Sequence, residues 1–155
     1  MRLHKKHFSE LTVEEFHDIV RARIDVFVVE QDCPYSDLDG KDKDAWHVWL
    51  TDGERLIAYC RVLKQGTSCE EASIGRVICL ERRKGYGTRV LNEAIALARR
   101  VYGADAIRIH AQKYAKPFYE GVGFKQCSED FLEDGIVHVE MIRTLTDADV
   151  SREEL

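Results

Sequence analysis

The amino-acid sequence predicts an α/β domain in which a mixed central β-sheet is flanked by helices. Its 155 residues are close to the size of one ordinary domain, and hydrophobic residues make up 45% of them. Segments with strand-like alternation and segments with helical spacing follow one another in the order β-α-βββ-α-β-α-ββ. We therefore expect a single domain over residues 1–155, with a polar, frayed tail over residues 145–155.

The first third of the chain predicts a strand, a long helix and an irregular loop. Residues 3–8 form a short strand-like run, and Thr12 followed by Glu15 has the spacing of a capping box at a helix start. Apolar residues then recur at helical spacing, which predicts a helix over residues 12–30. Residues 31–44 contain proline, glycine and five aspartates, so we expect a long acidic loop there.

The middle of the chain predicts three strands. An aromatic and β-branched run over residues 46–51 and an apolar run over residues 55–63 flank an Asp-Gly turn, which is typical of a hairpin. After a second turn at Gly66, residues 72–79 form the third apolar run.

The last third predicts two helices and three more strands. Apolar residues at helical spacing predict an amphipathic helix over residues 88–102, which Gly103 caps. Pro117 is tolerated in the first turn of a short helix over residues 114–121. The expected strands cover residues 107–111, 124–128 and 136–144, the last two joined around a turn at residues 134–135.

Charge is unevenly distributed along the chain, whose net charge is −5. Residues 76–125 carry 11 basic and 4 acidic groups, whereas residues 126–155 carry 2 and 9. A cationic middle segment in an anionic chain indicates an anionic ligand held locally, and it disfavours a nucleic-acid-binding protein with a basic face throughout. Chance clustering of charges on solvated faces is the alternative.

Neither a membrane span nor a disulfide framework is expected. No apolar run approaches the ~18 to 20 residues that span a bilayer, and MRLHKKHFSEL at the N-terminus lacks the apolar stretch of a secretory signal. The five cysteines are odd in number and form no C-x-x-C pair, which argues against disulfides and against a Cys-rich zinc site. We therefore expect reduced cysteines, no bound metal and a cytoplasmic protein.

The segment Arg82-Arg83-Lys84-Gly85-Tyr86-Gly87-Thr88 lies between a predicted strand and a predicted helix. A helix start presents unpaired N–H groups and the positive end of the helix dipole, so it attracts phosphate oxygens. Glycines let the backbone take a positive φ and approach an anion closely, and the three cations add charge. The alternative is a Gly-rich turn that only joins strand to helix, because a short G-x-G match recurs by chance.

Two patterns resemble the GNAT superfamily of acetyl-coenzyme A-dependent N-acetyltransferases. Arg82-x-x-Gly85-x-Gly87 after an apolar strand is similar to that family's pyrophosphate loop, and Ala115-x-x-Phe118-Tyr119-x-x-x-Gly123-Phe124 resembles its short helix. The order of predicted elements also resembles the GNAT, or acyl-CoA N-acyltransferase, fold. The stretches that resemble the ElaA subfamily of bacterial GNAT proteins are residues 27–42, 74–87, 111–124 and 133–141.

The resemblance implies a protein that binds acetyl-CoA and transfers its acetyl group to a primary amine of a small molecule or peptide, by direct attack in a ternary complex. The Ile78 N–H is expected to donate to the oxygen of the tetrahedral intermediate. Arg83 stands where the family usually has glycine, and coenzyme binding should survive this departure if the backbone there stays in an ordinary region. The cofactor-binding residues implied are Val77, Ile78, Cys79, Arg82, Arg83, Lys84, Gly85, Tyr86, Gly87, Thr88 and Phe118.

Tyr119 and His138 are the catalytic residues that the resemblance implies. Tyr119 matches the family's position for the acid that protonates the departing thiolate, whose thiol has a pKa of ~8.5; the alternative is a core aromatic. An attacking amine with a pKa of ~10.4 must lose a proton, and His138 titrates near neutral pH. The alternative is a histidine that only shapes the pocket. Glu30, His47 and His110 are weaker candidates for the base.

We expect the residues that bind the acceptor amine at the end of the first helix and in the acidic loop. Carboxylates there would attract a cationic amine, although a solvated charged loop is the alternative for Asp37, Asp42 and Asp44. Arg76 points instead to an acidic group on the acceptor, so the two indications oppose each other. The expected substrate-binding residues are Glu30, Gln31, Tyr35 and Arg76.

A second class of function stays open: a non-catalytic acetyl-CoA sensor that keeps the cofactor site and has lost transfer. The presence of both Tyr119 and His138 favours the enzyme. No nucleic-acid or membrane partner is expected, and a homodimer is expected from the resemblance alone.

Overall fold

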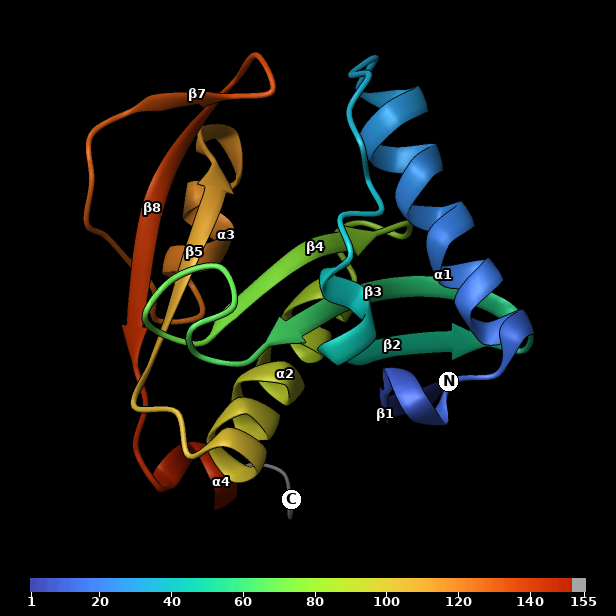
Figure 1. Cartoon of the computed structure of the whole chain (residues 1–155), viewed down its shortest axis with the longest axis horizontal. Helices are drawn as coiled ribbons and strands as arrows, with labels where there is room; N and C mark the ends of the chain where they lie inside the picture. The colour runs from blue at the N-terminus through green and yellow to red at the C-terminus, as the bar shows by residue number, and fades with distance from the viewer. Residues whose placement is uncertain (152–155) are drawn as a thin grey trace.

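Two antiparallel β-sheets lie side by side in the computed structural model, which describes residues 1–151 (Figure 1). The predicted α/β architecture is confirmed, and across residues 1–151 its parallel component is one bridge between Ala72 and Ile107. The first sheet has the strand order β1 (Arg2–His7), β2 (Trp46–Asp52), β3 (Arg55–Leu63) and β4 (Ser73–Cys79). The second sheet has the order β5 (Ala106–Gln112), β8 (Ile136–Thr144) and β6 (Lys125–Gln126), and β7 (Phe131–Glu133) also pairs with β8.

Helix α1 (Val13–Ile24) begins where the sequence predicts it. Thr12 and Glu15 form the expected capping box, in which each side chain accepts the other residue's backbone N–H. The end of the predicted helix differs, because residues Asp25–Glu30 form a π-helical turn, η2. A wider turn of this kind changes the direction in which the chain leaves the helix.

Helix α2 (Tyr86–Tyr102) packs its apolar face on the side of the first sheet opposite to α1. Side chains alternate between the two faces along a strand, so Trp49 and Tyr59 lie under α1, whereas Val48 and Cys60 face α2. The residues that α2 buries there are Val90, Leu91, Ala94, Ile95, Leu97 and Ala98.

Shorter helical segments join and flank the strands. Pro117 lies in the first turn of α3, as predicted. The segments are η1 (Phe8–Glu10), η3 (Lys41–Asp44), η4 (Lys113–Ala115), α3 (Lys116–Glu120) and α4 (Ala148–Ser151).

Strands β4 and β5 start together and then diverge (Figure 1). They meet at Ala72 and Ile107, where the Arg108 N–H donates to the Ala72 carbonyl at 3.0 Å. Beyond this point the two strands separate toward Cys79 and Gln112. The divergence leaves backbone groups on two facing edges without a neighbouring strand, and such groups are ready to bind a ligand.

A β-bulge distorts β4 close to this divergence. Tyr59 pairs with Ile78 and Arg61 pairs with Gly75, so β4 has one residue more than β3 between these pairs. Arg76 lies in the bulge with a φ of +53°. Bulges bend a strand and re-aim its side chains, and this one sets the direction of Arg76.

The C-terminal strands differ from the prediction. The strand expected over residues 124–128 shortens to β6, because the Ser128 hydroxyl, rather than a backbone carbonyl, accepts the Glu140 N–H at 2.8 Å. Strand β7 was not expected from the sequence. It pairs with β8, so the turn at residues 134–135 joins β7 to β8.

The expectation of a frayed tail from residue 145 onward is wrong for residues 145–151. Leu145 is buried, and α4 follows it. The Asp149 carboxylate accepts hydrogen bonds from Arg143 Nη2 at 2.9 Å and from the Thr146 N–H at 2.8 Å, which fixes this segment. The rest of the expected tail, residues 152–155, lies outside the described residues.

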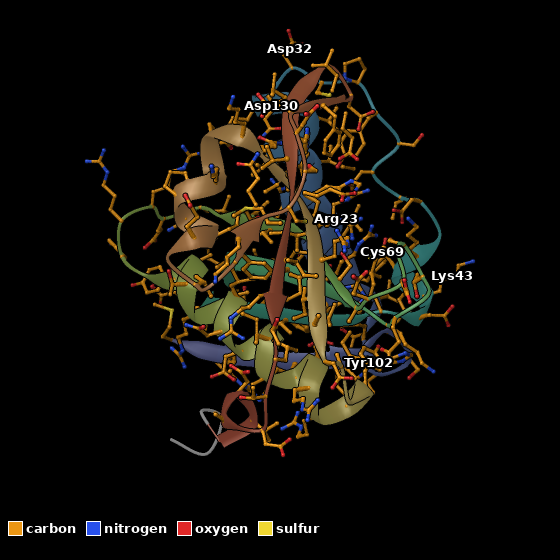
Figure 2. The ribbon with its side chains drawn as sticks, turned by 90° about the vertical axis from the view of Figure 1, so that its left-hand side faces the viewer. Arg23, Asp32, Lys43, Cys69, Tyr102 and Asp130 are labelled. Atoms are coloured by element: carbon orange, nitrogen blue, oxygen red, sulfur yellow. The ribbon has the colours of Figure 1, made fainter. Side chains whose placement is uncertain are left out.

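A fully buried arginine joins α1 to the acidic loop over residues 31–44. Arg23 is 0% exposed, and Figure 2 shows it in the interior of the molecule. It donates through Nε to Asp37 Oδ2 at 3.0 Å and through Nη1 to Asp42 Oδ1 at 2.7 Å. A buried charge needs such partners, because removing it from water is costly.

A second arginine ties the same loop to β3. Arg61 donates to Asp42 Oδ1 at 3.2 Å and to Asp39 Oδ2 at 2.7 Å. The solvated-loop alternative is therefore wrong for Asp42, which is buried and structural, and it fits Asp44, which is exposed. Burial by itself would raise the pKa of Asp42, but its hydrogen bonds with Arg23 and Arg61 hold that pKa below its ordinary value.

Asp42→Asn should lower the free energy of unfolding by about 3 kcal/mol at pH 7, because it leaves two buried guanidinium groups with one carboxylate fewer. The lowered pKa means that this stabilisation is complete above the unfolded value of about 4 and is lost as the pH falls below it. The difference between the two proteins should therefore shrink below about pH 4. Urea unfolding across pH measures both effects, and Asp44→Asn, on the exposed side of the same turn, is the control. Equal destabilisation by both substitutions would contradict the assignment.

Candidate active site

One large cavity opens where β4 and β5 diverge. Its volume is about 1040 Å³, and it is lined by the end of β4, the start of α2, α3, the end of β5, the β7–β8 hairpin and the segment after η2. Residues predicted for cofactor, catalysis and acceptor share this cavity. Those that line it are Gln31, Tyr35, Arg76, Val77, Ile78, Cys79, Arg82, Arg83, Gly85, Tyr86, Gly87, Thr88, Phe118, Tyr119 and His138.

Two predicted site residues lie outside the cavity. Lys84 is exposed and its ammonium forms an ion pair with Glu81 at 3.3 Å. Glu30, at the exposed end of η2, accepts a hydrogen bond from Arg82 Nη2 at 3.3 Å. The structure therefore does not bring Lys84 to the cofactor site or Glu30 to the acceptor site.

The loop before α2 has the geometry of an anion-binding helix start. Gly85 is the N-cap of α2 with a φ of +79°, and no side chain within residues 1–151 caps the helix. The N–H groups of the first turn therefore point into the cavity region without the usual capping partner. The condition stated for Arg83 is not met, because its φ is +65°, in the region that glycine favours.

Gly87 serves close packing rather than an unusual backbone angle. It lies inside α2 and, contrary to the expectation for both glycines, does not have a positive φ. A Cβ at this position would lie 3.5 Å from the Phe118 ring and 3.6 Å from Cys79 Cβ. A single methyl group fits these distances, whereas a branched side chain would push on Phe118.

The strand register determines which N–H groups of β4 face the cavity. Leu80 donates to the Ile57 carbonyl at 2.8 Å, and hydrogen-bonded and non-bonded pairs alternate along antiparallel strands. The pair of Ile78 and Tyr59 is therefore a bonded one, which directs the Ile78 N–H toward β3. The next N–H, that of Cys79, points toward the open side, so the expectation of an Ile78 donor is wrong.

Tyr119 lines the cavity from α3. Its ring packs edge-on against Phe118 and Phe124, with centroids 5.1 and 6.0 Å away. No group within residues 1–151 hydrogen-bonds its hydroxyl, which leaves that hydroxyl free for a ligand. Burial raises the pKa of the Tyr119 phenol, so it carries its proton throughout the neutral range.

His138 lines the same cavity from β8 and is 6% exposed. Its Nδ1 lies 2.7 Å from the Ile136 carbonyl oxygen. A carbonyl only accepts, so Nδ1 carries a hydrogen and Nε2 of the neutral ring has the lone pair. Nε2 lies 3.5 Å from Glu133 Oε2. The tautomer thus leaves the nitrogen that can accept a proton beside a carboxylate.

Glu133 is a cavity residue that the sequence analysis missed. It lies on β7 and accepts from His110 Nδ1 at 2.9 Å, while His110 Nε2 lies 3.1 Å from Glu140 Oε1. The hydrogen bond with Glu133 raises the pKa of His110, and the same bond lowers the pKa of Glu133. Recognising β7 as a strand would have placed Glu133 opposite Ile136, which is two residues from His138 on β8 and on the same face of the sheet.

The acceptor side of the cavity is built by side chains that hold one another. Gln31 and Gln112 exchange amide hydrogen bonds at 3.2 and 3.4 Å. The Tyr35 hydroxyl donates to Asp37 Oδ1 at 2.5 Å, and Arg76 lies over the Tyr35 ring, 5.2 Å from its centroid. These contacts fix the wall that faces the open end of β5.

Arg76 is already paired within the protein. Its guanidinium lies 3.0 Å from Asp37 Oδ1 and 3.4 Å from Asp39 Oδ2. Two carboxylates thus neutralise the charge that the sequence analysis offered to an acidic acceptor. The carboxylates that indicated a cationic acceptor are paired too, Asp37 with Arg23 and Asp39 with Arg61. The ion pairs of this loop therefore favour neither of the two opposing indications.

His47 lies away from the cavity. Its Nε2 donates to the Asp42 carbonyl at 3.1 Å, and its Nδ1 accepts from the Tyr59 hydroxyl at 2.7 Å. Burial lowers the pKa of His47 to about 4. It is a neutral, structural histidine, and the weaker base hypothesis for it is wrong.

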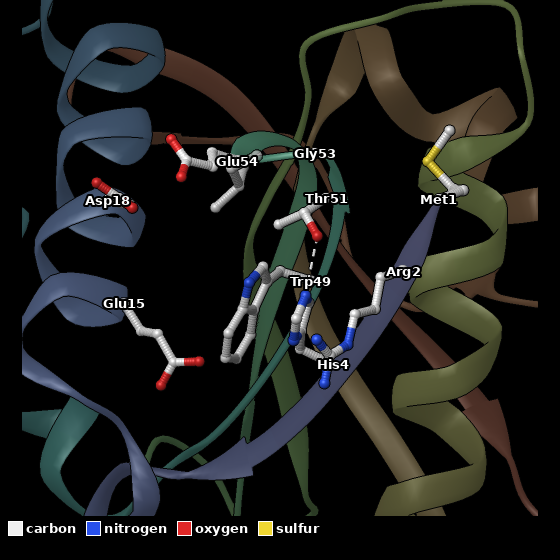
Figure 3. Close-up of a pocket in the computed structure, with 10 residues that line it drawn as sticks. Met1, Arg2, His4, Glu15, Asp18, Trp49, Thr51, Gly53 and Glu54 are labelled. Atoms are coloured by element: carbon white, nitrogen blue, oxygen red, sulfur yellow. Dashed lines mark hydrogen bonds between the residues drawn. The ribbon is translucent and has the colours of Figure 1, made fainter.

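A second cavity, of about 340 Å³, lies between α1 and the edge of the first sheet and shares no lining residue with the large one (Figure 3). His4 stacks on Trp49 at 4.8 Å and bonds the Thr51 hydroxyl at 2.9 Å. Glu15 in its wall is held by Lys6 at 2.9 Å. The second cavity contains no glycine-rich helix start. We therefore take the large cavity as the candidate active site.

Three further observations concern the described part of the chain. The five cysteines are free thiols. No cluster of three or more His, Cys, Asp or Glu side chains in residues 1–151 is arranged to hold a metal ion. No helix within residues 1–151 is long and apolar enough to cross a membrane.

Known proteins have sequences similar to this one. The family model of the GNAT acetyltransferase domain matches residues 5–145. A UPF0039 protein of Schizosaccharomyces pombe is 39% identical over 140 residues, which are 88% of this chain and 92% of that protein. Protein ElaA of Escherichia coli is 35% identical over 146 residues, which are 92% of this chain and 95% of ElaA.

Solved structures share the fold. The crystal structure of an acyl-CoA N-acyltransferase from Pseudomonas aeruginosa aligns with a TM-score of 0.86 at 32% identity, covering 93% of this chain and 100% of that one. The crystal structure of Escherichia coli ElaA aligns with a TM-score of 0.85 at 34% identity, covering 92% and 98%. The predicted resemblance is confirmed: the chain belongs to the GNAT acetyltransferase family and is similar to ElaA.

Proposed function

We propose that this protein is an N-acetyltransferase that moves the acetyl group of acetyl-CoA to a primary amine of a small molecule or peptide. The observation that carries the proposal is that one cavity holds the helix-start cradle together with Tyr119 and His138. Family membership supports transfer from a coenzyme A thioester. The amine nitrogen attacks the thioester carbon directly, with both substrates bound together.

The start of α2 binds the pyrophosphate in this proposal. The N–H groups that follow Gly85 lack a capping side chain, and the helix dipole favours an anion there. Arg82 and Arg83 line the same end of the cavity and add positive charge. The Cys79 N–H, which faces the open side of β4, donates to the thioester oxygen as negative charge develops on it.

Tyr119 is the proposed acid. Its hydroxyl is protonated and unpaired, and it lies in the cavity. When the tetrahedral intermediate collapses, the C–S bond breaks and the phenol proton passes to the departing sulfur. The phenolate then regains a proton from solvent before the next turnover.

His138 is the proposed base. Its Nε2 lone pair faces the cavity region while Nδ1–H stays bound to the Ile136 carbonyl. Nε2 accepts the proton that the cationic amine must lose before its nitrogen can bond to the carbonyl carbon, and the second proton that the nitrogen loses after attack passes to solvent. The wall on this side includes the carboxylates of Glu133 and Asp134, and this supports a cationic amine as the acceptor.

A thiol-release assay with acetyl-CoA and a broad panel of amines tests the activity. We expect release of coenzyme A with at least one primary amine and the acetylated amine as its product. Tight binding of acetyl-CoA without transfer to any amine would contradict the enzyme and support the sensor.

Localisation in the cytoplasm and a homodimeric state are also part of the proposal. The free thiols support a reducing compartment, because cysteines stay unpaired there. The homodimer rests on family resemblance, and sedimentation velocity would test it.

Gly87→Val should weaken coenzyme A binding by about tenfold or more, because the branched side chain crowds Phe118 and Cys79 in the cradle. Gly87→Ala, whose methyl group fits, should bind nearly as well as the wild type. Arg82→Ala should cost about threefold or less, because this exposed arginine is already paired with Glu30. Calorimetry measures the coenzyme A affinity of all three variants. Wild-type affinity in Gly87→Val would contradict the assignment of the start of α2 as the coenzyme site.

Tyr119→Phe should lower kcat by roughly 10²-fold while coenzyme affinity holds, because it removes the acid and keeps the ring. Packing should change little, since the hydroxyl has no partner within residues 1–151. Steady-state kinetics and circular dichroism check the two expectations. A folded variant within a few-fold of wild-type kcat would mean that Tyr119 only packs.

His138→Ala should lower kcat/KM and change the acidic limb of its pH profile, because it removes the proposed base. His17→Ala, which removes an exposed histidine on α1, is the control and should leave the profile unchanged. Rates measured from pH 5 to 9 give both profiles. An acidic limb unchanged in the His138 variant would place the base elsewhere.

A further inference from the structure

A chain of titratable side chains leads from the cavity toward solvent across β8, β7 and β5. His138 Nε2 lies 3.5 Å from Glu133 Oε2, and Glu133 Oε1 lies 2.9 Å from His110 Nδ1. His110 Nε2 in turn lies 3.1 Å from Glu140 Oε1, and the other oxygen of Glu140 accepts from Arg108 at 3.2 Å. The side chain of His138 is 8% exposed, whereas those of Glu133 and His110 are each 43% exposed.

We propose that Glu133 is a positioning residue of the transferase: it holds its carboxylate beside His138 as the counter-ion of the imidazolium that forms when His138 accepts the amine proton. This proposal rests on the proposed function, because it assumes that His138 is the base. The two carboxylate oxygens of Glu133 contact different histidines. Oε1 is fixed by His110, and Oε2 is left to face His138.

The separation between Glu133 and His138 suits this role. At 3.5 Å the two groups are within ion-pair distance, but the geometry is not that of a hydrogen bond. The Nε2 lone pair therefore remains available for the amine, and the attraction grows when the ring becomes charged. The acceptor's proton ends on Nε2, and from there it can pass by Glu133 Oε2 to water.

The other groups around Glu133 keep it ionised. The charged and titratable groups that face it are His110, His138 and, at longer range, Arg76. His110 lies between two carboxylates, those of Glu133 and Glu140. Phe131 stacks on His138 at 5.9 Å and covers the ring with an apolar surface, which strengthens the nearby charge interaction. A carboxylate in this position attracts the positive charge that His138 carries once it has accepted the amine proton.

NMR titration of the histidine rings tests the proposal without any acyl transfer. In Glu133→Gln the midpoint of His138, assigned with the His138→Ala variant, should fall by roughly half a pH unit or more, because the counter-ion is gone. Glu133→Ala should show the same shift, and Glu133→Asp should show a smaller one. Glu129→Gln, which removes an exposed carboxylate from the loop before β7, should leave the midpoint unchanged.

Kinetics supply the second readout. The acidic limb of kcat/KM should move to lower pH in Glu133→Gln and recover in Glu133→Asp, a change that a merely structural residue would not cause. An unchanged His138 midpoint in both folded Gln and Ala variants would overturn the proposal. A shifted midpoint in a protein that acetylates no amine would uphold the pairing of Glu133 with His138 and refute the transferase.

Discussion

The acceptor side of the cavity depends on the buried ion pairs that Arg23 forms with Asp37 and Asp42. A charge at 0% exposure requires opposite charges around it, and Asp37 and Asp42 supply them from the loop after α1. The loop must therefore fold back over α1 and β3. This places Tyr35 and the bulged Arg76 on the cavity wall, where Asp37 contacts both. The acidic loop expected to be solvated is thus held by buried ion pairs, and two further ion pairs neutralise the charge of Arg76.

The divergence of β4 and β5 makes the other half of the site. The two strands bond where they begin and part where the cavity opens, so the Cys79 end of β4 presents backbone donors to a ligand. The helix start at Gly85 follows directly, and α3 brings Tyr119 to the same space. The proposed chemistry uses what this geometry leaves unpaired: a helix N-terminus, a strand edge, a phenol and an imidazole nitrogen.

Local patterns predicted most of the fold, because capping, turn chemistry and apolar periodicity act over a few residues. Thr12 with Glu15, the Asp-Gly hairpin and the face of α2 are such cases. What depends on distant partners could not be predicted. Nothing near Asp42 in the sequence distinguishes it from exposed Asp44, since Arg23 and Arg61 decide its burial. Strand β7 has three residues and exists through its pairing with β8, so Glu133 was missed with it. The glycine-rich loop was recognised, but the positive φ of Arg83 was not.

In the proposed function, one cavity binds the coenzyme at the start of α2 and presents the coenzyme sulfur to Tyr119. A crystal structure of the protein with coenzyme A tests this claim most directly. We expect pyrophosphate oxygens within hydrogen-bond distance of the backbone N–H groups that follow Gly85, and the coenzyme sulfur about 3 to 3.5 Å from the Tyr119 hydroxyl. A pyrophosphate bound elsewhere, or a sulfur that Tyr119 cannot reach, would contradict it.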